Sequence, residues 1–254
     1  MFLRKRLFVA ALALLALFGA YRAAYRVPIL MYHVVGDPAE YGGLGVRPAT
    51  FERQMEFLRA HGYHVIGLEE LVRLVREGRR APLGTVVITF DDGTIDNIDK
   101  AFPVLKKMGF PATVFMITSN IDREGWLSAE DLRLMDASEI TIGSHTVSHA
   151  YLPDLRSEED VVREIRQSKR TLEDLLGHPV TLFSYPAGGF TGSIRSIVAA
   201  EGYEGAVTTN QGLAANDPYA LHRVKVRDSA GNLFNFWAKT TGLYHIGKKR
   251  IVTE

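Results

Sequence analysis

Short apolar segments alternate with amphipathic segments along most of the chain. The runs TVVITF (85–90) and ATVFMIT (112–118) are apolar or nearly so throughout, which is typical of strands covered on both faces. The segments TFERQMEFLRAHG (50–62) and SEEDVVREIRQSKRTLEDLLG (157–177) place apolar residues three and four positions apart, which predicts helices. About eight such alternations predict a single α/β domain, either a parallel barrel or a doubly wound sheet.

Local signals indicate where the helices begin and end. Thr50 is predicted as the N-cap of the first amphipathic helix and Gly62 as its end. Ser128 is predicted to cap a later helix, and Pro103 should bend the helix that covers residues 95–109. In both candidate architectures the chemistry gathers where strands end, so the residues that follow each strand are the candidates for function.

The first 26 residues form a different kind of segment. The basic cluster Arg4, Lys5 and Arg6 precedes an apolar run over 7–20, which is typical of an export signal. The run is short for a membrane span, but no small-x-small cleavage site ends it. We therefore expect residues 1–26 to be a signal peptide or a membrane anchor, and a buried N-terminal helix is the weaker alternative. Residues 27–254 would then form one exported domain.

Composition narrows the classes of partner. The hydrophobic share of 46% and charged share of 23% are ordinary for a globular protein, and the lack of cysteine excludes disulfides and cysteine-bound metals. The first 26 residues hold five of the 30 basic residues and no acidic residue, so the remainder has 25 basic and 29 acidic residues. That net charge of −4 does not indicate nucleic-acid binding.

Two acidic residues follow the strand predicted over 85–90. Strict alternation would point Asp91 and Asp92 to opposite faces of the sheet, but Gly93 allows the chain to turn so that both reach one site. The plainer interpretation is a surface turn in which Asp92 caps the next helix.

Two histidines follow the strand predicted over 139–145. His145 and His149 are four residues apart and would share one face if the segment turned helically. Two imidazoles and one carboxylate make an open three-ligand site for a divalent ion, with positions left for water and substrate. Two unrelated surface histidines are the alternative.

Other candidates are weaker when taken alone. The SYPAGG turn (184–189) exposes backbone N–H groups that can stabilise an oxyanion, although it also suits a plain connecting loop. His33 ends the first predicted strand, where it is a candidate general acid or a histidine at the edge of the core. The aromatic residues Tyr185, Trp126 and Trp237 either stack on sugar rings or belong to the core.

The motifs TFDDG (89–93) and HTVSH (145–149) together resemble those of the polysaccharide deacetylase family, carbohydrate esterase family 4. The resemblance covers nearly all of residues 27–254 and implies a distorted parallel (β/α) barrel. The segments VPILMYH (27–33) and TFERQMEFLRAHGYHVIGLEEL (50–71) are similar to one branch, the exported deacetylases of poly-N-acetylglucosamine.

The resemblance implies a role for each motif residue. Asp91 resembles the general base, and Asp92, His145 and His149 resemble the metal ligands, with zinc as the expected ion. The N–H of Ala187 would help to stabilise the oxyanion.

The chain departs from the family pattern at two places. Ser184 stands where the family has an arginine that holds the base, and Arg223 is our candidate replacement. Tyr185, in the same motif, is a candidate substrate contact. The family's general acid is a histidine in a late motif, but ILMYH resembles that motif moved to the first strand, which favours His33 over His222.

The implied reaction is hydrolysis of N-acetyl groups on N-acetylglucosamine units of an extracytoplasmic polysaccharide. An O-acetyl esterase acting on a polysaccharide such as xylan and a non-catalytic glycan-binding protein are the alternatives. A glycoside hydrolase is disfavoured because adjacent carboxylates rarely reach the separation of about 5–9 Å that such enzymes need.

Overall fold

The computed structural model describes residues 2–210, 217–228, 232–244 and 246. The strands are β1 (Ile29–Tyr32), β2 (His64–Val65), β3 (Thr85–Phe90), β4 (Ala112–Met116), β5 (Ile140–Ser144), β6 (Leu182–Ser184), β7 (Gly205–Val207) and β8 (Val224–Lys225). The α-helices are α1 (Phe2–Ala24), α2 (Pro48–Ala60), α3 (Leu68–Arg76), α4 (Phe102–Met108), α5 (Ala129–Asp136), α6 (Glu158–Leu176), α7 (Gly192–Ala200) and α8 (Leu233–Thr240). Short helices cover 97–101, 118–120, 152–154 and 186–188.

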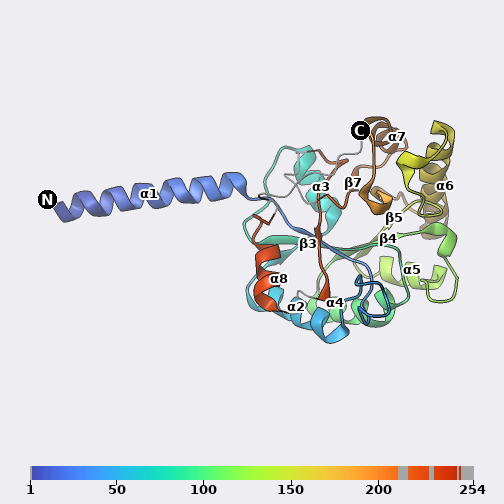
Figure 1. Ribbon diagram of the computed structural model, residues 1–254, viewed down its shortest axis with the longest axis horizontal. Helices are drawn as coiled ribbons and strands as arrows, with labels where there is room; N and C mark the ends of the chain where they lie inside the picture. The colour runs from blue at the N-terminus through green and yellow to red at the C-terminus, as the bar shows by residue number, and fades with distance from the viewer. Residues whose placement is uncertain (1, 211–216, 229–231, 245, 247–254) are drawn as a thin grey trace.

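The strands form one curled, all-parallel sheet surrounded by helices (Figure 1). Their order is β7-β6-β5-β4-β3-β1-β8, and β2 pairs with the start of β3. A parallel bridge between Val207 and Leu221 joins β7 to the residues just before β8. The two ends of the strand order therefore meet, and the predicted distorted (β/α) barrel is confirmed.

The two faces of the sheet bury different sets of side chains. Leu30, Ile88 and Val114 belong to a large cluster that also contains apolar residues of α2, α4, α5 and α6. The neighbouring positions Val87 and Phe115 belong to a second, smaller cluster with residues of α3. Because successive residues of a strand point to opposite faces, continuous apolar runs are what a sheet covered on both faces requires.

The helix boundaries test the capping signals. Ser128 caps α5 as predicted, because its hydroxyl accepts from the Asp131 N–H while the Asp131 carboxylate accepts from the Ser128 N–H. The prediction for Thr50 is wrong: α2 begins at Pro48, since proline is favoured in the first helical turn. The single helix expected over 95–109 is instead a π-helical turn over Asn97–Ala101 followed by α4, which has Pro103 in its first turn.

The N-terminal helix α1 projects from the barrel as a separate rod (Figure 1). Within the described residues, the stretch Lys5–Ala24 is the one helix long and apolar enough to cross a membrane. Its large apolar residues from Leu7 to Phe18 are half exposed or more, so the barrel does not cover them.

Packing of the larger cluster can be tested on a single helix. Leu132 of α5 is fully buried, whereas Leu134 on the same helix is 51% exposed. We expect Leu132→Ala to lower the free energy of unfolding by about 2–5 kcal/mol, since it leaves a cavity. Leu134→Ala should change it by less than about 0.5 kcal/mol. Urea denaturation followed by circular dichroism measures both, and equal effects would contradict the placement of α5.

Candidate active site

The turn after β3 brings two adjacent carboxylates to one place. Asp92 has a left-handed backbone (φ 77°), and Gly93 follows in the same region (φ 83°). The turn therefore begins at Asp92 itself, one residue earlier than Gly93 alone would allow, and it breaks the alternation that would separate the two side chains. A Cβ at position 93 would clash with the sulfur of Met116, so glycine is required there.

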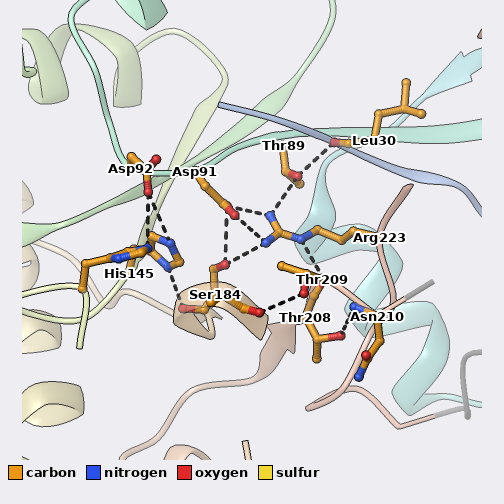
Figure 2. Close-up of polar contacts among 12 residues, drawn as sticks. Leu30, Thr89, Asp91, Asp92, His145, Ser184, Thr208, Thr209, Asn210 and Arg223 are labelled. Carbon is orange, nitrogen blue, oxygen red and sulfur yellow. Dashed lines mark hydrogen bonds and ion pairs between the residues drawn. The ribbon is translucent and has the colours of Figure 1, made fainter. Parts of the chain in front are cut away.

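Asp91 is held by a buried arginine from the far end of the chain. Arg223, just before β8, donates from Nη1 to Asp91 Oδ1 and from Nη2 to Asp91 Oδ2, both at 2.6 Å (Figure 2). Neither side chain is more than 3% exposed. This fork-to-carboxylate geometry is the strongest form of ion pair available to a carboxylate, and it places Arg223 where the family arginine was expected.

Ser184 and two threonines complete the surroundings of the guanidinium. Arg223 also donates to Ser184 Oγ (3.0 Å), to Thr89 Oγ1 (3.3 Å) and to the carbonyl of Thr208 (3.1 Å). Ser184 Oγ in turn donates to Asp91 Oδ1 at 3.4 Å. The serine that replaces the expected arginine therefore stays within the same network and leaves room for Arg223.

The charge state of Asp91 follows from this network. Burial alone would raise the pKa of Asp91, but the charge and hydrogen bonds of Arg223 hold it well below its usual range. Asp91 is therefore ionised at any pH at which the protein would work.

The two histidines meet through backbone bends and not through a helical turn. Thr146 (φ 66°) and His149 (φ 60°) both adopt left-handed backbone, and the segment between them is not helical. The imidazole rings of His145 and His149 lie 4.9 Å apart between centroids. The expectation that they share one site agrees with this geometry, but its stated reason, helical spacing, is wrong.

A carboxylate of α6 supports these bends. Glu164 accepts hydrogen bonds from the backbone N–H groups of Val147 and Ser148, both at 2.9 Å, and from Ser148 Oγ at 2.8 Å. The backbone around Thr146 also accepts from the segment after β4, at Thr118 N. The loop is thus fixed from two sides.

Asp92, His145 and His149 form a group with metal-ligand geometry. Asp92 Oδ1 lies 3.6 Å from Nε2 of each histidine, and one ligand atom from each of the three lies within 4.8 Å of the others. Two ligands about 2.1 Å from a tetrahedral ion are about 3.4 Å apart. The spacing of these three atoms therefore fits a divalent ion between them.

The hydrogen bonds and charges of the three residues agree with that use. The Nδ1–H of His145 donates to the carbonyl of Ser184 at 2.7 Å, which leaves the Nε2 lone pair free for a cation. Burial lowers the pKa of His145 to about 4 and also lowers that of His149, so both rings are neutral. Burial and the charge of Asp91 raise the pKa of Asp92 to about 7. A cation bound between these three groups would be held by two neutral imidazoles and one carboxylate.

His33 lies at the same end of the sheet. The N–H of Asp91 donates to the carbonyl of Tyr32 at 3.0 Å, so His33 follows β1 directly beside the acidic turn. The carbonyl of His33 accepts from Asn97 Nδ2. Burial lowers the pKa of its imidazole to about 4, although the nearby charge of Asp91 opposes this shift. His33 is thus a neutral, half-buried ring within the electrostatic reach of Asp91.

The rival histidine lies in the segment that carries Arg223. His222 is half-buried and immediately precedes Arg223, which points into the site.

The aromatic candidates need correction at one position. Tyr185 is fully buried, its hydroxyl donates to the carbonyl of Tyr219, and its ring stacks on Phe190. The prediction that it contacts substrate is wrong, because its side chain belongs to the core. Trp126 is half-buried and Trp237 is 45% exposed, but Trp237 lies on α8, near the start of β3 and not its end.

Ala187 is exposed and has left-handed backbone (φ 51°) within the turn after β6. Its carbonyl accepts from Thr209 Oγ1 at 3.0 Å, which fixes the orientation of the peptide group that follows Ala187. Sequence reasoning gave no role to Thr89, Thr208 or Glu164. Thr89 opens the TFDDG motif, but its contact with Arg223, like those of Thr208 and Glu164 with the site, joins residues distant in the sequence.

The fold and the site define a class of protein: a parallel α/β barrel with a carboxylate–arginine pair beside a cluster suited to a divalent metal. The sequence profile of the polysaccharide deacetylase family matches residues 78–206. The chain belongs to the polysaccharide deacetylase family, and it is accordingly a hydrolase of the deacetylase type. His33 and Arg223 lie outside the matched residues, so their assignment rests on geometry.

Individual relatives agree with this assignment. YxkH of Bacillus subtilis (strain 168) is 35% identical over 203 residues, which are 79% of this chain and 71% of that protein. The poly-beta-1,6-N-acetyl-D-glucosamine N-deacetylase of Staphylococcus aureus (strain MRSA252) is 26% identical over 211 residues, 75% of this chain and 71% of that one. The deacetylase PplD of Streptococcus pyogenes, solved in complex with acetate, superposes with a TM-score of 0.77 at 28% identity, covering 84% of this chain and 97% of PplD.

The buried pair can be tested by removing one partner. We expect Arg223→Met to lower the free energy of unfolding at pH 7 by about 3–5 kcal/mol, because Asp91 is left charged and buried without a partner. The double variant Arg223→Met, Asp91→Asn should recover much of that loss. Urea denaturation of the three proteins gives the comparison.

The pH dependence of the same variants has a predicted sign. In the parent the folded-state pKa of Asp91 is depressed, so its contribution to stability is present above the unfolded pKa and is lost as the pH falls. In Arg223→Met burial is left to raise that pKa, so the penalty is present at high pH and disappears as the pH falls. The stability gap between variant and parent should therefore narrow between pH 7 and pH 5. A gap that is constant with pH would mean that Asp91 is not the group left unpaired.

Proposed function

We propose that this protein is a metal-dependent deacetylase that removes N-acetyl groups from N-acetylglucosamine units of an extracytoplasmic polysaccharide. The observation that carries the proposal is the group Asp92, His145 and His149 beside the ionised Asp91. The N-deacetylase activity named for the Staphylococcus aureus relative supports the choice of substrate. Acetate, which was bound in the PplD structure, would be one product.

Asp92, His145 and His149 would hold the metal. A divalent ion bound there supplies a Lewis acid that polarises the acetyl carbonyl and makes a bound water more acidic. A mixed set of two imidazoles and one carboxylate suits zinc best. Glu164 and the carbonyl of Ser184 would orient the two histidines through the contacts described above.

Asp91 would act as the general base. Its ionised carboxylate is always ready to accept a proton from the attacking water, but the ion pair with Arg223 makes it a weak base. The fork of Arg223 therefore serves chiefly to fix the carboxylate in position and to keep it charged. The proton would move on as the amine leaves.

His33 would protonate the departing amine. Its pKa of about 4 keeps the resting ring neutral, so it must receive the proton during the reaction before it can donate it. Its place beside the turn that carries Asp91 suits that relay. The N–H of Ala187 would add a hydrogen bond to the developing oxyanion.

The N-terminal segment supports a location outside the cytoplasm. The stretch Lys5–Ala24 is apolar enough to span a bilayer, and the basic residues before position 7 favour keeping its start in the cytoplasm. The barrel would then be anchored at the outer face of the membrane, where an acetylated polysaccharide is the substrate.

Acetate release tests this function directly. Full-length protein incubated with defined N-acetylglucosamine oligomers should release acetate, and dialysis against a chelator should abolish the release. Added zinc should restore it. His145→Ala and His149→Ala should lose most bound metal, measured by elemental analysis, while retaining the helical circular dichroism signal.

The role of Asp91 is tested by a single variant. Asp91→Asn should retain metal and lose turnover, because the amide cannot accept a proton.

Two other results would favour the alternative functions. Release of acetate from acetylated xylan but not from the amide substrate would identify an O-acetyl esterase. Metal content without acetate release from either polymer would identify a glycan-binding protein.

The choice of general acid is tested with two substrates. His33→Ala should lower turnover on the amide by about 10²–10⁴-fold, because the amine must be protonated to leave. It should affect 4-nitrophenyl acetate little, since that leaving group needs no proton. His222→Ala is the matched control and should change neither rate. Selective loss of amide turnover in His222→Ala would reverse the assignment.

A further inference from the structure

The last turn of α1 is attached to the N-terminal end of the barrel. Tyr21 Oη donates to the carbonyl of Thr241 (3.2 Å), and the N–H of Arg26 donates to the carbonyl of Gly242 (3.0 Å). Tyr25 is 7% exposed and donates to the carbonyl of Thr85, the first residue of β3, at 2.9 Å. The joint therefore lies where strands begin, at the end of the sheet opposite to the candidate active site.

Four arginines line a cavity of about 130 Å³ at this joint. Arg22 belongs to the last turn of α1, and Arg26 lies two residues beyond the end of that helix. Arg79 and Arg80 belong to the turn after α3. Arg22 Nη1 donates to the carbonyl of Ala81 at 2.9 Å, and Arg80 Nη1 donates to the carbonyl of Arg22 at 3.1 Å. The helix and the turn thus hold each other in place around the cavity. We call this group of four residues the arginine pocket.

The charges of the arginine pocket are largely unpaired. Among the described residues that line it, none is acidic, and the one carboxylate that pairs with any of the four is Glu77, at 2.9 Å from exposed Arg79. The Nε of Arg26 is buried without a hydrogen-bond partner in the described part of the chain. Arg26 Nη1 donates to the carbonyls of Ala23 and Tyr25, so its charge is held in place by neutral groups alone. Four arginines that line one cavity favour an anion there, and planar guanidinium forks match the oxygens of a phosphate.

The length of α1 places this pocket at a particular depth. The stretch Lys5–Ala24 has 20 residues, which span about 30 Å, the thickness of a bilayer's hydrocarbon core. Arg22 lies in the last turn of that stretch and its long side chain can reach toward the interface, while Arg26, Arg79 and Arg80 lie beyond the stretch. The pocket would therefore lie at the level of the lipid headgroups. Tyr21 and Trp237 line a second cavity at the same joint. The centroid of the exposed Phe234 ring lies 5.5 Å from that of Trp237. Tyrosine and tryptophan are enriched at that same interface.

We propose that the arginine pocket binds the phosphate of an anionic membrane lipid. This contact fixes the barrel with the beginnings of its strands against the bilayer and its candidate active site facing away from it. The proposal rests on the membrane location of α1 given above, but it is independent of the reaction that the site performs.

Lipid binding to the full-length protein in a non-ionic detergent tests the proposal. Native mass spectrometry would count molecules of dihexanoyl-phosphatidylglycerol bound per chain, with dihexanoyl-phosphatidylcholine and inorganic phosphate as comparison ligands. We expect phosphatidylglycerol to bind at least tenfold more tightly than either. Arg79→Gln combined with Arg80→Gln should weaken that binding at least fivefold.

The matched control is Arg53→Gln combined with Arg59→Gln, which removes the same charge from exposed positions on α2. This control should bind phosphatidylglycerol as the parent does, and acetate release should be unchanged in both double variants. Equal loss in both would show a general charge effect and overturn the proposal. Phosphatidylcholine that binds as tightly as phosphatidylglycerol would overturn it as well. Inorganic phosphate that binds as tightly would also overturn it, because the pocket would then be a site for free anions.

Discussion

The ion pair between Arg223 and Asp91 is the contact on which the rest of the site depends. It joins the residue before the last strand to the end of β3, and so ties the closing segment of the barrel to its centre. Burying two charges costs several kcal/mol for each ion, and the fork geometry together with the bonds to Ser184, Thr89 and Thr208 offsets that cost. A strand of only two residues can close the sheet because this pair holds the segment before it in place.

Backbone strain is concentrated around the same site. Of the six non-glycine residues with positive φ in the described part of the chain, four lie in the turns that follow β3, β5 and β6: Asp92, Thr146, His149 and Ala187. Each such residue costs of order 1 kcal/mol or more and persists only where its surroundings hold it. Here the supports are visible, since Glu164 holds the histidine loop from α6. Regular strands would have pointed these groups to alternate faces, so the strain is what gathers them.

The two ends of the barrel have different physical characters. The end where strands finish gathers carboxylates and neutral imidazoles with unused lone pairs, which suits a cation and a polar substrate. The end where strands begin gathers arginines and exposed aromatic rings around the foot of α1, which suits an anionic interface. A parallel sheet makes this separation possible, because all of its strands run from one end to the other. The same topology therefore places the candidate active site and the foot of α1 at opposite ends of the barrel.

The sequence by itself determined the parallel α/β class, because strands buried on both faces must be apolar throughout and helices must be amphipathic. It also allowed the candidate site residues to be recognised, since Asp91-Asp92-Gly93 and the pair His145 and His149 each lie within a few residues of one another in the sequence. Only the tertiary structure decided that Arg223 contacts Asp91, 132 residues away in sequence, and that Tyr185 turns into the core. The reason is physical: a local pattern records which face a residue prefers, whereas a contact across the barrel depends on how all the strands curl together. Helical spacing misjudged the histidine loop for the same reason, because contacts from α6 and the turn after β4 select its left-handed bends.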